Sequence, residues 1–135
     1  MKRKPMQSFT FNTSKSIICE CGAIARLAGI CQSVGISRPL IVTDAGIVNI
    51  GLLAPVESAL GDMAFASFYE VVADPPEAVI HQALAAAKAH QADGIIGFGG
   101  GSSLDTAKLV ALMAKSGESL EQIYGVDQAK GQRLP

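Results

Sequence analysis

The segment with the clearest chemical potential is a run of three glycines between an apolar stretch and a helical pattern. Gly99, Gly100 and Gly101 follow the apolar residues 94–98 and precede Ser102. Glycine lets the backbone turn tightly and approach a ligand closely. The start of a helix adds unpaired N–H groups and a partial positive charge. Phosphate is the usual ligand of such a turn, so the pattern indicates a site for a phosphate-containing compound.

The same turn also has an interpretation without any ligand. The series Gly97-x-Gly99-x-x-Ser102 ends in Ser where the dinucleotide-binding fingerprint has Gly or Ala. No Gly-Lys-Ser/Thr follows, so the turn is not a P-loop. In a purely structural turn, Ser102 caps the helix and Asp105, as its third residue, completes the cap. Both interpretations remain open at this point.

A second candidate site is the carboxylate of Asp44. It follows the apolar and β-branched residues 40–43, which predict a buried strand. An acid at the carboxyl end of a parallel strand is well placed to accept hydrogen bonds from ribose hydroxyls. The alternative is an Asp that begins a turn or caps the next helix. Spacing alone favours neither interpretation.

The residues that could ligate a metal ion lack a suitable spacing. His81 and His90 lie nine residues apart on one predicted helix, which places them on opposite sides of it. Cys19, Cys21 and Cys31 give three thiols, whereas a structural zinc usually needs four ligands. We therefore expect no metal site here and reduced thiols, as in a cytoplasmic protein.

Composition excludes several functional classes. The chain has 135 residues, 49% of them hydrophobic, and a formal net charge of −1. This length suits one domain. The balanced charge argues against binding to nucleic acid or to an anionic membrane surface. No apolar stretch reaches the roughly 18 residues that a membrane span needs.

The elements that must position these residues alternate along the chain. Short β-branched runs and helical runs predict an α/β fold with a mostly parallel sheet and helices on both faces. Two extended pieces around a polar turn in Phe9–Cys19 predict a β-hairpin at the start. Asp74 is predicted to cap a helix whose first residue is Pro75. The predicted strands then cover about 40–43, 65–72 and 94–98, and the helices cover about 23–34, 51–60, from 75, from 102 and 119–124.

Several of these segments together resemble one family. Ile41-Val-Thr-Asp44, Ala73-Asp-Pro75 and Gly99-Gly-Gly-Ser-Ser-Leu-Asp-Thr-Ala-Lys108 resemble the iron-containing (group III) alcohol dehydrogenases. Asp93-Gly-Ile-Ile-Gly97, in front of the glycines, fits the same family. The likeness runs from about Ile18 to Pro135, nearly the whole chain.

The resemblance implies that residues 1–135 form a Rossmann-like, NAD-binding α/β domain, incomplete relative to the family. A helical C-terminal domain that carries a divalent metal, iron or zinc, would lie beyond Pro135. In the whole enzyme, hydride would pass between the nicotinamide and a small alcohol or aldehyde. Without the metal that polarises the alcohol oxygen, this polypeptide alone is expected to transfer no hydride and to hold no catalytic residue. The sheet edge left open beyond Pro135 predicts self-association into a homo-oligomer.

The resemblance also assigns residues to the cofactor. Asp44 would hold the adenosine ribose and favour NAD over NADP, because a carboxylate repels a 2′-phosphate. Gly100, Gly101 and Ser102 would bind the pyrophosphate, and Asp105 would lie near the nicotinamide end of the cleft. Asp74 stands where the family often has Asn, also near the cofactor. The expected cofactor-binding residues are thus Asp44, Asp74, Gly99, Gly100, Gly101, Ser102 and Asp105.

Three other functions remain open. The first is a stand-alone nucleotide- or phosphate-binding module without catalysis. The second is an interaction domain in which the glycine turn holds no ligand. The third, within the enzyme class, is the N-terminal part of a zinc-dependent relative of the glycerol-dehydrogenase type.

Overall fold

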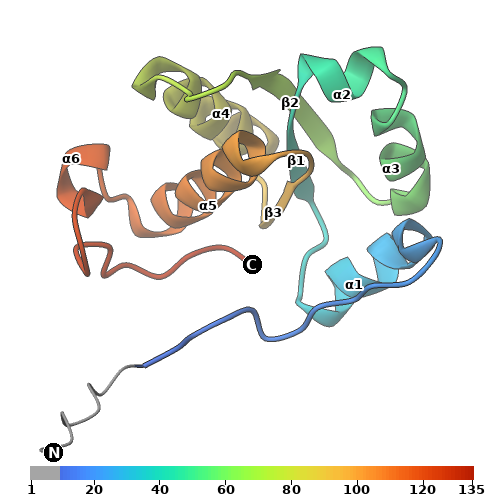
Figure 1. Cartoon of the computed structure of the whole chain (residues 1–135), viewed down its shortest axis with the longest axis horizontal. Coiled ribbons are helices and arrows are strands. Elements are labelled where there is room, and N and C mark those ends of the chain that lie inside the picture. The colour runs from blue at the N-terminus through green and yellow to red at the C-terminus, as the bar shows by residue number, and fades with distance from the viewer. Residues whose placement is uncertain (1–9) are drawn as a thin grey trace, which may run out of the picture.

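A three-stranded parallel sheet lies at the centre of the molecule, which a computed structural model describes for residues 10–135 (Figure 1). Its strands are β1 (Pro39–Asp44), β2 (Ala66–Val71) and β3 (Gly94–Gly97), in the order β2-β1-β3. In the register, Leu40 lies opposite Ala66 on one side and opposite Ile95 on the other. Every pairing is parallel because a helical crossover separates each strand from the next.

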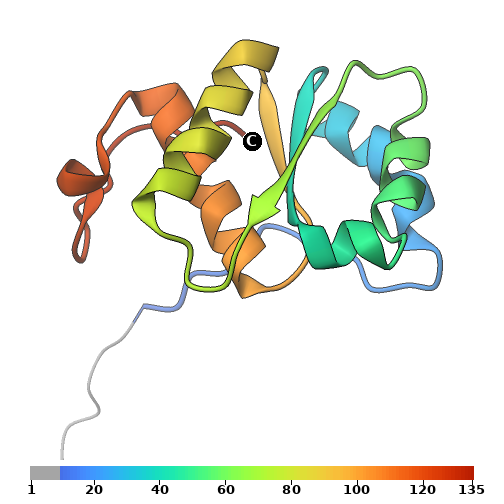
Figure 2. The ribbon, with the colours of Figure 1, turned by 90° about the horizontal axis from the view of Figure 1, so that it is seen from above.

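Helices cover both faces of this sheet (Figures 1 and 2). α1 and α3 pack on one face, while α4 and α5 pack on the other. The predicted α/β class, with a parallel sheet and helices on both faces, is therefore confirmed. Within residues 10–135, none of the helices is long and apolar enough to cross a membrane. The helical segments are η1 (Ala23–Arg26), α1 (Leu27–Ser33), α2 (Ala45–Asn49), α3 (Leu53–Leu60), α4 (Glu77–His90), α5 (Gly101–Ser116) and α6 (Leu120–Ile123).

The central strand β1 holds the core together because both of its faces are buried. Leu40 and Val42 pack with residues of α4 and α5, including Val110. Ile41 points to the opposite face and packs with residues of α1 and α3, including Val56. A strand buried on both sides has a continuous apolar sequence rather than an alternating one, as Leu40-Ile-Val42 shows.

The predicted N-terminal β-hairpin is wrong for the residues that the structure describes. Residues 10–19 contain no strand and are exposed along their whole length. Phe9, the first residue of that prediction, lies outside the described residues. A two-stranded hairpin is marginally stable in water unless it packs on a sheet or helix. Residues 10–19 pair with none of the three strands, so nothing stabilises a hairpin there.

Two helix starts differ from the predicted ones for local reasons. α4 begins at Glu77 with Pro76 as N-cap, so Asp74 does not cap it. Pro76 keeps the preceding residue, Pro75, out of the helical conformation, which delays the start. The predicted helix over 51–60 is preceded by a separate helix, α2, and Gly51 at a φ of 77° separates α2 from α3.

Candidate functional site

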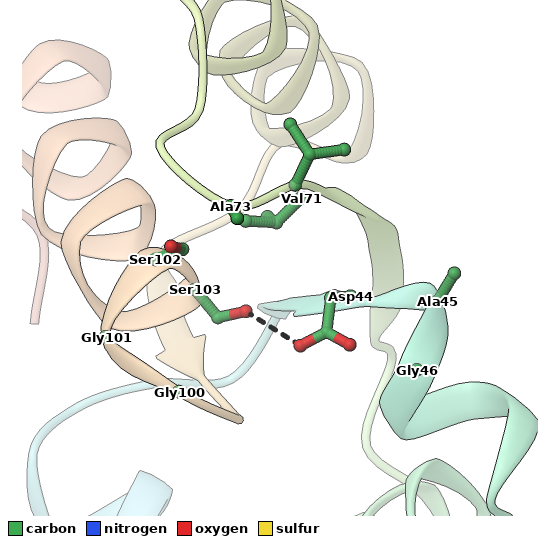
Figure 3. A pocket seen from close by; sticks show the side chains of 10 residues that line it. Asp44, Ala45, Gly46, Val71, Ala73, Gly100, Gly101, Ser102 and Ser103 are labelled. Carbon is green, nitrogen blue, oxygen red and sulfur yellow. Dashed lines mark hydrogen bonds between the residues drawn. The ribbon is translucent and has the colours of Figure 1, made fainter.

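The sheet order creates a crevice at the carboxyl ends of the strands. From β1 the chain runs to β2 on one side, then crosses over to β3 on the other side. At such a switch point the loops that follow the two neighbouring strands diverge and leave room for a ligand. A hollow of about 360 Å³ lies there, between the ends of β1, β2 and β3 (Figure 3). Its lining residues are Asp44, Ala45, Gly46, Val71, Val72, Ala73, Gly100, Gly101, Ser102 and Ser103.

One wall of the hollow is the N-terminus of α5. Gly100 is the N-cap, and no side chain among the described residues caps this end. Leu104 N–H makes the first hydrogen bond within the helix, to the Gly100 carbonyl at 3.1 Å. The N–H groups of Gly101, Ser102 and Ser103 therefore carry the positive end of the helix dipole without an intrahelical acceptor. The alternative in which Ser102 caps the helix is wrong, since Gly100 is the N-cap and Ser102 lies within the first turn.

The glycines of this wall differ in what they require. A Cβ on Gly100 or Gly101 would meet no heavy atom within 4 Å, and neither residue has a positive φ. Neither the backbone conformation nor a protein neighbour therefore requires glycine at these two positions. Gly99 is different, because its φ is 133° and a Cβ there would lie 3.2 Å from both Asp44 Oδ2 and Ser103 Oγ. Gly100 and Gly101 are both exposed, and without side chains they place no further atoms over the start of the helix.

The opposite wall carries the carboxylate of Asp44. Its Oδ1 accepts a hydrogen bond from Ile47 N–H at 3.0 Å, which caps α2. Its Oδ2 lies 3.4 Å from the Ser103 hydroxyl across the hollow (Figure 3). Of the two interpretations of Asp44, the helix cap is confirmed, and the carboxylate lines the hollow at the same time.

Sequence reasoning missed Ser103, although one signal for it was present. Ser103 lies four residues before the buried Ala107, on the same face of α5. Its side chain is therefore directed towards the sheet, and the residue as a whole is only 1% exposed. The residues from the end of β2, Val71 to Ala73, were also missed, because nothing in their types indicates a ligand.

The predicted site residues separate into two groups. Asp44, Gly100, Gly101 and Ser102 line the hollow. Gly99, Asp74 and Asp105 do not line it, although Gly99 directly precedes the lining residue Gly100 and Asp74 directly follows the lining residue Ala73. Asp105 is exposed on α5, where it lies 3.7 Å from Lys108 Nζ. The cofactor roles of all these residues remain predictions.

A polar contact far from the hollow fixes how β1 and β3 start. The Asp93 carboxylate, just before β3, accepts hydrogen bonds from the Ser37 hydroxyl and from Arg38 N–H, the latter at 2.7 Å. Partial burial acts to raise the pKa of Asp93, but the Ser37 hydroxyl and the backbone N–H groups outweigh it, so the pKa is lowered. The contact joins the beginnings of the two strands whose other ends carry Asp44 and the glycine turn.

The described residues provide no ligand set for a metal ion. Within residues 10–135, no three His, Cys, Asp or Glu side chains lie together in a way that could hold one. His81 is exposed, and His90 Nε2 lies 3.3 Å from the Ala64 carbonyl. No step through a metal is therefore assigned to this chain. The hollow offers main-chain donors for an anion on one wall and a carboxylate acceptor for hydroxyls on the other.

Several known proteins are similar to this chain in sequence and in fold. Sulfoacetaldehyde reductase from Bilophila wadsworthia is 34% identical over 130 residues, which cover 95% of this chain and 34% of that protein. NAD-dependent methanol dehydrogenase from Bacillus methanolicus is 29% identical over 116 residues, which cover 84% of this chain and 30% of that protein. The crystal structure of NADH-dependent butanol dehydrogenase A from Thermotoga maritima gives a TM-score of 0.82 at 25% identity, over 96% of this chain and 33% of that one.

The chain spans about a third of the length of these relatives. The part of this chain that they match includes the parallel sheet and the glycine turn. Residues 14–135 match the family described as iron-containing alcohol dehydrogenase. This chain belongs to the iron-containing alcohol dehydrogenase family.

Proposed function

We propose that this chain is the NAD-binding part of a metal-dependent alcohol dehydrogenase. In the whole enzyme, hydride passes between the nicotinamide and the carbon of a small alcohol or aldehyde. The observation that carries the proposal is the pair of open glycines, Gly100 and Gly101, at an uncapped helix start that faces Asp44 across the hollow. Two of the similar proteins, the methanol and butanol dehydrogenases, are NAD- or NADH-dependent by name.

The pyrophosphate of the dinucleotide binds at the start of α5. The N–H groups of Gly101, Ser102 and Ser103 donate to its oxygens, and the helix dipole adds a favourable potential. A hydrogen bond to a charged group contributes about 1.5–3 kcal/mol. The described residues that line the hollow include no Lys or Arg, so main-chain donors carry this interaction.

The adenosine ribose binds on the opposite wall. Each of the two Asp44 carboxylate oxygens already accepts one hydrogen bond, and a carboxylate has about four acceptor positions in all. Two positions therefore remain for the 2′- and 3′-hydroxyls. The negative charge of Asp44 disfavours a 2′-phosphate, which gives a preference for NAD over NADP.

The remaining predicted residues have peripheral roles in the proposal. Asp74, next to Ala73 at the rim, lies near the cofactor, and Asp105 faces the nicotinamide end of the cleft in the whole enzyme. When bound, the nicotinamide would supply the hydride chemistry, and the residues of this chain would bind and orient it. We place the protein in the cytoplasm, which the free thiols of Cys19, Cys21 and Cys31 favour. Self-association is part of the proposal and is measured by sedimentation. On β3 the Ile95 N–H already donates to the Pro135 carbonyl at 2.9 Å, so the free edge available for pairing among the described residues is that of β2.

Calorimetric titration of NAD, ADP and NADP into the chain tests the proposal. We expect NAD and ADP to bind with similar Kd, because the hollow takes the adenosine diphosphate portion. The Kd for NADP is expected to be at least about tenfold higher than the Kd for NAD, which corresponds to about 1.4 kcal/mol. The absence of binding by all three nucleotides would refute the proposal.

A further inference from the structure

We propose that Ser103 is a positioning residue for Asp44, and that the two side chains together fix the preference of the hollow for a ribose with a free 2′-hydroxyl. The inference rests on the proposed function, in which Asp44 binds the ribose. It adds a residue on the opposite wall that aims the carboxylate.

The Asp44 carboxylate connects two helix starts that are far apart in the sequence. Oδ1 accepts from Ile47 N–H at 3.0 Å, at the start of α2. Oδ2 faces the Ser103 hydroxyl, in the first turn of α5, at 3.4 Å (Figure 3). At that length the second contact is weak, so its importance lies in direction rather than in strength.

Two glycines provide the space in which this carboxylate lies. A Cβ on Gly46 would lie 2.9 Å from Asp44 Oδ1, closer than real Cβ atoms come. A Cβ on Gly99 would lie 3.2 Å from both Asp44 Oδ2 and Ser103 Oγ. Side chains at these positions would push the carboxylate and the hydroxyl out of place. The sequence thus keeps the space around both oxygens free.

The buried Ser103 hydroxyl has Asp44 as its hydrogen-bond partner. Ser103 is 1% exposed, and among the described residues its hydroxyl bonds to Asp44. A buried hydroxyl without a partner costs about 1–3 kcal/mol. This cost favours the one carboxylate orientation in which Oδ2 meets the hydroxyl.

The contact with Ser103 matters because the hydrogen bond from Ile47 N–H alone leaves the terminal torsion of Asp44 free to rotate. The terminal torsion of an Asp side chain is broad, with no sharply preferred angle. A single hydrogen bond to Oδ1 therefore leaves Oδ2 free to swing about that bond. The hydrogen bond from the Ser103 hydroxyl to Oδ2 fixes this rotation. The remaining acceptor positions of the carboxylate are then directed into the hollow.

Titration of ADP and 2′-deoxy-ADP isolates this effect, because the two probes differ in the 2′-hydroxyl alone. We expect the unaltered chain to bind ADP about tenfold more tightly than the deoxy probe, as for one charge-assisted hydrogen bond. In Ser103→Ala the ratio falls to about threefold or less, through weaker binding of ADP. Ser67→Ala is the matched control, since the Ser67 hydroxyl donates to Glu57 Oε1 at 2.8 Å outside the hollow. Its ratio is expected to equal that of the unaltered chain.

Two further variants separate positioning from a structural effect. Asp44→Ala is expected to remove the discrimination, and adding Ser103→Ala to it should change the ratio no further. Ser103→Cys keeps the size of the side chain and weakens the donor, so it gives the same answer if the alanine variant does not fold. A full ratio in Ser103→Ala or Ser103→Cys, with ADP still bound, overturns the inference and leaves the proposed function intact. An unaltered chain that binds neither probe overturns both.

Discussion

Replacement of Gly101 by Ala should separate ligand binding from stability. The new methyl group meets no protein atom within 4 Å. Gly101 does not have a positive φ, so its backbone conformation accepts an alanine without strain. Ala is better than Gly inside a helix by about 0.8–1.0 kcal/mol, and by less at the first position. We therefore expect the free energy of unfolding to stay the same or to rise by up to about 1 kcal/mol.

The same methyl group should weaken nucleotide binding strongly. It stands beside the N–H groups that face the hollow, in the space that a phosphate oxygen needs to approach them. The loss of one hydrogen bond to a charged group costs about 1.5–3 kcal/mol. The Kd for NAD and for ADP should thus rise by about 10- to 100-fold.

Gly117→Ala, at the other end of the same helix, is the matched control. Gly117 has a φ of 71° and donates its N–H to the Met113 carbonyl at 3.0 Å. Ala in this left-handed conformation costs roughly 1–2 kcal/mol, so stability should fall while the Kd is unchanged. Thermal unfolding and calorimetry of both variants measure the two effects. If Gly101→Ala binds nucleotides like the unaltered chain, the open glycines do not serve a ligand and the reasoning is wrong.

Three further predictions concern the scaffold. Because its folded pKa is lowered from 3.8, Asp93 stabilises the fold fully above that value and loses this effect as the pH falls through the folded pKa. Asp93→Asn should therefore lower the Tm at neutral pH, and this loss should shrink as the pH falls below 3.8; a loss that does not depend on pH would contradict this. Burial and the charge of Asp93 raise the pKa of Cys31, so its thiol should react with a disulfide reagent only after unfolding, whereas the two exposed thiols react at once. Gly94→Ala should cost about 1–3 kcal/mol in denaturant unfolding, because the Ile36 side chain fills the space its Cβ would take. An unchanged midpoint would show that Ile36 moves aside freely.

The sequence predicts the fold correctly where the hydrophobic pattern agrees with the residues that begin and end helices and strands. Leu40-Ile-Val42 is apolar on every residue, which indicates a strand buried on both sides, and the structure confirms it. The helix expected over 119–124 is present as α6, and Ser119 and Gln122 form a capping box at its start, with both reciprocal hydrogen bonds present. Local signals of this kind depend on residues within one or two turns, so they can be read without knowing what packs against them.

The site was predicted in part because its members come from separate segments. Asp44 and the glycine turn were found since each follows an apolar strand, and parallel strands end at the same edge. Ser103 was missed because its role depends on a carboxylate 59 residues away. The N-terminal hairpin failed for a related reason, since a strand needs a neighbour that residues 10–19 lack. The Ser103–Asp44 contact and the lack of a strand in residues 10–19 depend on neighbours in the folded structure, which local sequence patterns do not indicate.

The three walls of the hollow, at residues 44–46, 71–73 and 100–103, meet only when the whole sheet is assembled. Any nucleotide held there binds the native chain and not the denatured one. At a free concentration one hundred times the Kd, such binding shifts the unfolding equilibrium by about 2.7 kcal/mol. Proteases that cleave transiently opened chains then act on a population about a hundredfold smaller. The supply of nucleotide would thereby govern how long this polypeptide survives in a cell.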